Sequence, residues 1–197
     1  MVFTGRPRDD YRSHPVVRQG DASTGFTVLE LVVALAVLTV VVLSVVQVTI
    51  YTARAVAVAR QLTMGALLAA DKLEQLRGLV WAYDASGLPI GDTQSDVTVD
   101  PERSSGGAGL RPSPAYALVH NVAGYCDFVD PRGRSLGGGS EPPPGTAFVR
   151  RWAIAPLGAS LDSLVIQVRA LDRATADRGG TSASDVTLAT IRTRVAP

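Results

Sequence analysis

The sequence of 197 residues contains a single cysteine, Cys126, so no disulfide can form within the chain. The cysteine content therefore does not indicate an oxidising or a reducing compartment. An excess of one charge is lacking as well, because 19 basic residues stand against 18 acidic ones. This balance leaves no global field to attract nucleic acid or an acidic substrate. Lys72 is the only lysine among many arginines, which we interpret as a compositional bias and not as a site.

Motifs of catalysis and metal binding are also lacking. The sequence has no GxSxG nucleophile elbow, no phosphate-binding GxxxxGK[ST] loop and no HExxH zinc motif. His120 and Cys126 lie six residues apart, but no familiar spacing supplies the two further ligands of a zinc site. They could form a nucleophile pair, although we expect them on adjacent strands in a structural role. We therefore expect no enzyme activity and no cofactor.

Two groups of charged residues remain as candidate binding sites. The first is acidic and lies between residues 84 and 102: Asp84, Asp92, Asp96, Asp100 and Glu102. Oxygen ligands suit Ca²⁺, but their irregular spacing favours solvated turn residues. The second is basic and lies near Tyr125, Phe128 and Trp152: Arg132, Arg134, Arg150 and Arg151. Arginines with aromatic residues can hold a DNA strand, but the balanced charge disfavours DNA contact; we expect Trp152 inward and the arginines outward.

What the sequence does contain is a long apolar segment. The 23 residues from Leu31 to Ala53 carry no charge. A helix needs about 20 apolar residues to cross a bilayer, so we expect this segment to span one. A cleaved signal peptide has a shorter apolar core, and an uncleaved signal anchor would leave the domain tethered by one helix. Four arginines precede the segment, which favours a cytoplasmic N-terminus.

Neither a signal peptide nor an anchor explains Glu30 at the start of this segment. A carboxylate within a membrane span costs about 2.5–3.5 kcal/mol on insertion scales and is ordinarily kept for a function. Cleavage between Gly25 and Phe26 would place a new α-amino group four residues before Glu30, or beside the glutamate of a neighbouring copy. The unpaired N–H groups of a first helical turn also favour a carboxylate there.

The stretch GFTVLELVVALAVL, which begins at Gly25, resembles the processing and methylation site of type IV prepilins and of type II secretion pseudopilins. Gly25 matches the glycine before the cut, Phe26 the residue that is N-methylated, and Thr27 the small polar residue after it. Glu30 matches the glutamate at the fifth mature position. The resemblance implies several partners: a prepilin peptidase and methyltransferase, other pilins or pseudopilins, an inner-membrane assembly platform and membrane lipid.

The helical pattern continues beyond the apolar segment. An apolar stripe at helical spacing indicates a face that packs on a sheet: Leu62, Ala66, Ala69, Leu73, Leu76 and Val80. The stretch LAADKLEQLRGLVW, from Leu68 to Trp81, resembles the segment after the membrane helix in the minor pilins called pilus modification proteins, and in one class of minor pseudopilin. The long leader and the lone cysteine also favour a minor subunit.

Five short apolar runs follow a Gly- and Pro-rich stretch and are typical of strands: residues 116–120, 125–129, 147–154, 164–171 and 186–195. We expect an α+β, pilin-like fold in which a long N-terminal helix, transmembrane in its first half, packs against a C-terminal antiparallel β-sheet. The expected parts are a leader (1–25), a transmembrane and assembly helix (26–53), its amphipathic continuation (54–80), an irregular loop (81–115) and a β-sheet part (116–197).

The function expected from these features is that of a minor structural subunit that helps to prime or cap a type IV pilus or pseudopilus. The protein would cross the inner membrane once, with a cytoplasmic N-terminus and an extracytoplasmic globular domain, and then enter the filament. The alternatives are a minor pseudopilin of type II secretion, a signal-anchored periplasmic binding domain and an exported enzyme.

Overall fold

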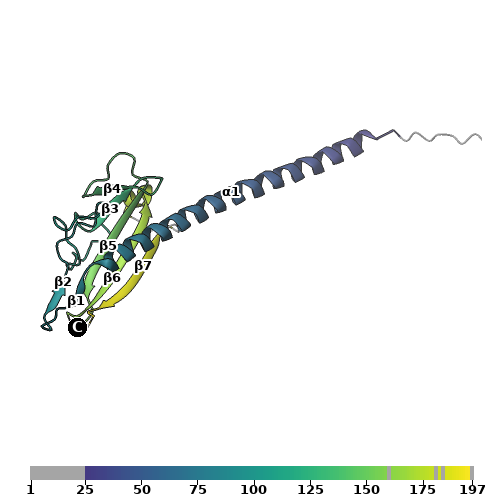
Figure 1. Cartoon of the computed structure of the whole chain (residues 1–197). Helices are drawn as coiled ribbons and strands as arrows, with labels where there is room; N and C mark the ends of the chain where they lie inside the picture. Colours follow the sequence, from purple (N-terminus) through teal and green to yellow (C-terminus); the bar gives the residue numbers. More distant parts are fainter. Residues whose placement is uncertain (1–24, 159–160, 180–181, 183–184, 196–197) are drawn as a thin grey trace, which may run out of the picture. The chain divides into compact units, whose positions relative to one another are not determined.

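The computed structural model describes residues 25–158, 161–179, 182 and 185–195, and Figure 1 shows its helices and strands. The chain divides into two units, residues 1–48 and 49–197. Apart from Gly25, the predicted leader lies outside the described residues.

The longest element is helix α1, Val28–Gly78, which begins and ends within two residues of the predicted bounds. Every described residue from 25 to 63 is exposed. Two of the polar residues in its apolar part bond their hydroxyl groups within the helix, because Thr39 donates to the carbonyl of Ala36 and Ser44 to that of Val40, each at 2.7 Å. By length and composition, α1 is apolar enough to cross a membrane.

The second unit adds a β-sheet layer to the last turns of α1. A five-stranded antiparallel sheet has the order β4-β3-β5-β6-β7, and a separate pair joins β1 and β2 (Figure 1). The bounds are β1 Trp81–Tyr83, β2 Pro89–Gly91, β3 Cys126–Val129, β4 Ser135–Gly138, β5 Phe148–Pro156, β6 Ser163–Asp172 and β7 Val186–Thr193. The short helix α2, Arg173–Arg178, follows β6.

The main core lies between α1 and one face of this sheet. On β6, Leu164, Ile166, Val168 and Ala170 are buried, as the alternating pattern predicted. They pack with Trp152 and Ile154 of β5 and with Leu68, Ala69 and Leu76 of α1. A smaller cluster on the opposite face joins Phe128, Val149 and Leu171 to Ala176 of α2. The predicted α+β arrangement of a long helix and an antiparallel sheet is confirmed.

Several local predictions were wrong. The run Tyr116–His120 forms turns instead of a strand, because the N–H groups of Ala117 and Val119 donate to carbonyls three residues earlier. The predicted loop 81–115 contains β1 and β2. These strands are joined by a turn in which Asp84 accepts from the N–H groups of Ser86 and Leu88, both at 2.8 Å.

The buried face of α1 is also rotated from the predicted stripe. Leu62 and Val80, the two ends of that stripe, are exposed, whereas Gly65, Leu68 and Lys72 are buried. Ala69 and Leu76 are buried as predicted. The predicted stripe did not include Lys72, which lies on the buried face between Leu68 and Leu76.

Candidate functional site

The predicted processing segment lies immediately before α1. Gly25, Phe26 and Thr27 are not helical, and the first turn carries Glu30. The Glu30 N–H donates to Thr27 Oγ1 at 3.2 Å, and the Leu31 N–H donates to the carbonyl of Thr27, also at 3.2 Å. Thr27 is therefore the N-cap of α1, and Thr27 to Glu30 has the sequence of a capping box.

The described structure gives no steric reason for glycine at position 25. A Cβ atom built on Gly25 would meet no atom within 4 Å, and its φ is not in the left-handed region. Phe26 is 83% exposed, although a large aromatic side chain is ordinarily at least partly covered. These two residues contribute nothing to the described packing.

Polar side chains at the other end of α1 form a buried charged cluster, which sequence reasoning missed. Lys72 is 1% exposed and pairs with Asp127 at 2.8 Å. Arg150 reaches the same carboxylate through Nε and Nη2, both at 2.8 Å, and pairs with Asp71 at 2.9 Å. The fully buried carboxylate of Asp127 therefore pairs with two buried cations, and Asp71 supplies a second carboxylate to one of them. The available signal was the place of the only lysine, four residues after Leu68 and four before Leu76 on the buried face.

The electrostatics of the cluster follow from its burial. Burial lowers the pKa of Lys72, while its pairing with Asp127 opposes this shift. Burial also acts to lower the pKa of Arg150, but Asp127 and Asp71 outweigh it and raise that pKa above its usual value. Lys72 on α1 and Arg150 on β5 both pair with Asp127 on β3. Lys72 Nζ also lies 4.9 Å from the ring centre of Trp152.

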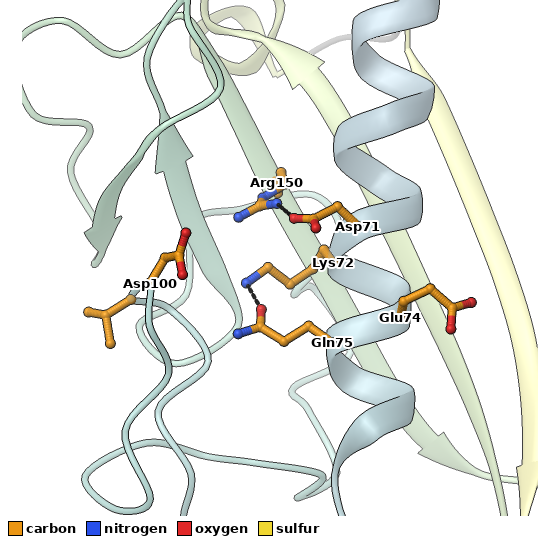
Figure 2. Close-up of a pocket in the computed structure, with 7 residues that line it drawn as sticks. Asp71, Lys72, Glu74, Gln75, Asp100 and Arg150 are labelled. Atoms are coloured by element: carbon orange, nitrogen blue, oxygen red, sulfur yellow. Dashed lines mark hydrogen bonds and ion pairs between the residues drawn. The ribbon is translucent and has the colours of Figure 1, made fainter.

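The cluster fixes a loop to the helix. Lys72 donates to the carbonyl of Val97 at 2.5 Å and to Gln75 Oε1 at 2.6 Å, and Gln75 donates to Glu102. Figure 2 shows Lys72 and Gln75 pointing from α1 toward the loop of Asp100, whereas Glu74 points away. The cavity of about 290 Å³ between them is lined by charges of both signs, which suits a structural contact better than a substrate pocket.

The four arginines considered as a candidate basic patch do not form one. Arg150 and Arg151 are buried, at 6% and 3% exposure, and Arg134 pairs with Asp130 at 2.8 Å. The expectation that the arginines face outward was therefore wrong for two of the four, while the inward position of Trp152 is confirmed. Buried guanidinium groups cannot follow a nucleic acid backbone on the surface.

The acidic loop residues, His120 and Cys126 also make local structural contacts. Asp84, Asp92 and Asp96 accept hydrogen bonds from backbone N–H groups in their own turns, as the sequence predicted. Cys126 is buried on β3, where its thiol donates to the carbonyl of Gly139 at 2.8 Å. His120 lies in a turn against the ring of Tyr116, so the expected adjacent strands were wrong. Within the described ranges, no three metal-ligating side chains come together.

Comparisons of the chain with known protein families, with curated proteins and with solved structures returned no match.

Proposed function

We propose that this chain is a minor structural subunit of a type IV pilus or pseudopilus, processed between Gly25 and Phe26. The observation that carries the proposal is the uncovered apolar part of α1, which is headed by Glu30 and preceded by an exposed, non-helical Gly25–Phe26 pair. An apolar helix needs lipid or other apolar helices around it. A prepilin-like subunit would have both in turn: lipid while its helix lies in the membrane, and other apolar helices once it enters the filament.

The exposed segment suits a peptidase substrate. Proteases act on extended chain, and the cap at Thr27 keeps residues 25–27 out of the helix. Because the described packing does not require glycine at position 25, recognition by a processing enzyme is a reason for that residue. In this proposal the leader stays in the cytoplasm, the apolar helix crosses the inner membrane, and the α+β unit lies beyond it.

The experiment that tests this function is mass spectrometry of the mature N-terminus, on protein extracted from its native membrane. A chain that begins with N-methylated Phe26 supports the proposal. A chain that still begins with Met1 would instead be a signal-anchored domain, and one that begins near Ala57 a secreted protein. Either result would refute the proposed function.

A minor pseudopilin of type II secretion is the alternative within the same class, because the prepilin-like features are shared by both machines. The partners that copurify with the cleaved chain distinguish them: pilus subunits in the first case and secretion-system pseudopilins in the second.

A further inference from the structure

A cavity of about 450 Å³ lies between α2 and the turn that precedes β3. Its polar lining comes from four segments: His120 and Asn121 in the turn, Ser140 after β4, Arg151 on β5, and Asp177 and Arg178 in α2. All of these residues belong to the second unit. The cavity is separate from the charged cluster around Lys72 and from the processing segment.

Arg151 is a buried cation that has only neutral partners. Its side chain donates through Nε to Asn121 Oδ1 at 2.9 Å, through Nη1 to the carbonyl of Val119 at 2.5 Å, and through Nη2 to the carbonyl of Ala176 at 3.5 Å. A guanidinium group has five N–H donors, so two of them remain unused. No carboxylate of the described residues lies within 4.0 Å of it.

The neighbouring carboxylates compensate for the charge of Arg151 only in part, because none of them is in direct contact with it. The cross-strand partner of Arg151 on β6 is Arg169, which is itself a cation. Arg169 pairs with the carboxylate of Asp185 at 2.8 Å. Burial, followed by the charge of Arg169, lowers the pKa of Arg151, and the carboxylates of Asp177 and Asp185 oppose this shift without reversing it. A buried cation without a counterion is costly.

A second uncompensated cation lines the same cavity. Arg178 is exposed and donates a hydrogen bond to Thr175 Oγ1 at 3.2 Å, and it has no carboxylate partner within 4.0 Å in the described part of the chain. Asp177, the acidic residue of the lining, pairs with Arg173 at 3.5 Å, and Arg173 does not line the cavity. Two guanidinium groups therefore line one hollow with a single carboxylate, that of Asp177, which is also paired with Arg173.

We propose that this cavity binds a small group with anionic oxygens, a phosphate or a carboxylate, between Arg151 and Arg178. The two unused donors of Arg151 supply the planar fork that such oxygens accept, and hydrogen bonds between charged groups are about twice as strong as neutral ones. The anion would neutralise a cation that the fold has already buried. The proposal does not depend on the function proposed above.

The test uses the full chain in detergent micelles and titrates inorganic phosphate or acetate against chloride at the same ionic strength. The readout is the NMR signals of the arginine Nε–H groups. Saturable binding with a Kd of about 1 mM or tighter, accompanied by shifts of the Arg151 and Arg178 signals, is the expected result. Preference for phosphate or for acetate identifies the tetrahedral or the planar group as the natural one.

Arg178→Gln is the variant of choice because its side chain is exposed, so the fold should survive. It should raise the Kd by roughly tenfold, the loss of one charge-assisted hydrogen bond. Arg132→Gln is the matched control, since it removes the same charge from an exposed turn that does not line the cavity. Equal affinity of the Arg178 variant and wild type, an equal loss in both variants, or shifts no larger than those with chloride would each overturn the proposal.

Discussion

At the scale of single residues, Asp127 controls the most tightly coupled charges of the second unit. It is fully buried and pairs with both Lys72 and Arg150. Asp127→Asn would leave two buried cations with only Asp71, an exposed acid, as a counterion. We expect this variant to lose about 3–5 kcal/mol of unfolding free energy, the usual cost of breaking a buried pair from one side. Urea unfolding of the full chain in detergent micelles measures it.

Lys72→Met provides the comparison for Asp127. It removes a buried cation but leaves Arg150 bound to the carboxylate through two hydrogen bonds. The cost should be smaller, about 1–2 kcal/mol, from the unsatisfied carbonyl of Val97. If the lysine variant were as unstable as the Asp127 variant, Asp127 would not be the shared counterion that the distances indicate.

Cys126 gives a prediction about reactivity. Burial raises the pKa of its thiol to about 11, from 9.0 for a free thiol. At pH 8 the folded chain should therefore hold about 100-fold less thiolate than the unfolded chain, because the two pKa values differ by two units. Iodoacetamide labelling followed by mass spectrometry should be slow in the folded chain and fast in urea. Rapid labelling of the folded chain would show that the thiol is not buried.

The same shift fixes the sign of a pH effect on stability. Because the folded pKa is higher than the unfolded one, the protonated thiol contributes stability that is complete below pH 9. This contribution is lost as the pH rises from 9 to about 11. Cys126→Ala should lack this component of alkaline destabilisation.

At the scale of elements, Arg192 on β7 fastens the end of α1. Its guanidinium donates to the carbonyl of Leu76 at 3.1 Å and to that of Leu79. These carbonyls lie at the C-terminal end of the helix, where backbone acceptors lack helical partners and the dipole favours a cation. Arg192→Met should cost about 1–2 kcal/mol of unfolding free energy, and Arg192→Lys should recover part of it. Chemical unfolding curves of the two variants decide the point.

The long elements and the short strand β3 were predictable from the sequence, whereas β1, β2 and β4 were not. The apolar runs over 147–154 and 164–171 predicted β5 and β6 to within two residues, and on β6 the burial alternates with the period of two that a half-buried strand leaves in the sequence. Strands β1, β2 and β4 have three or four residues, too few to establish a period. Their pairing depends on contacts distant in sequence.

The charged cluster shows the same limit. Lys72 and Asp127 are 55 positions apart in sequence, and nothing in the local pattern of either residue identifies the other as its partner. Only the position of Lys72 on the buried face of α1 was available to periodicity. The capping box from Thr27 to Glu30, in contrast, is a local signal that the sequence displays in full.

At the scale of the whole molecule, the two parts of α1 need different surroundings. Residues 25–63 are exposed and mostly apolar, so they need lipid or neighbouring helices. Residues 65–76 instead contribute apolar side chains to the core of the α+β unit and one of its buried cations, Lys72. A subunit that leaves a membrane for a filament needs this division, since the first part must exchange its surroundings while the second keeps its fold.

Glu30 is the residue on which the assembly proposal depends, and two variants separate its possible roles. Glutamine can replace glutamate in a capping box, whereas alanine cannot. If Glu30 pairs with an α-amino group during assembly, both Glu30→Gln and Glu30→Ala should be cleaved after Gly25 like wild type but should be absent from the filament fraction. Immunoblots of membrane and filament fractions measure both steps in one experiment.

The glutamine variant decides between charge and capping. It keeps the helix start at Thr27 and the polar side chain, but it carries no charge to pair with an amine. Normal incorporation of Glu30→Gln together with loss of Glu30→Ala would mean that Glu30 serves the helix cap and not the amine. Loss of cleavage in both variants would place the carboxylate in recognition by the peptidase. Only cleavage without incorporation in both variants fits a charge that is neutralised when subunits meet.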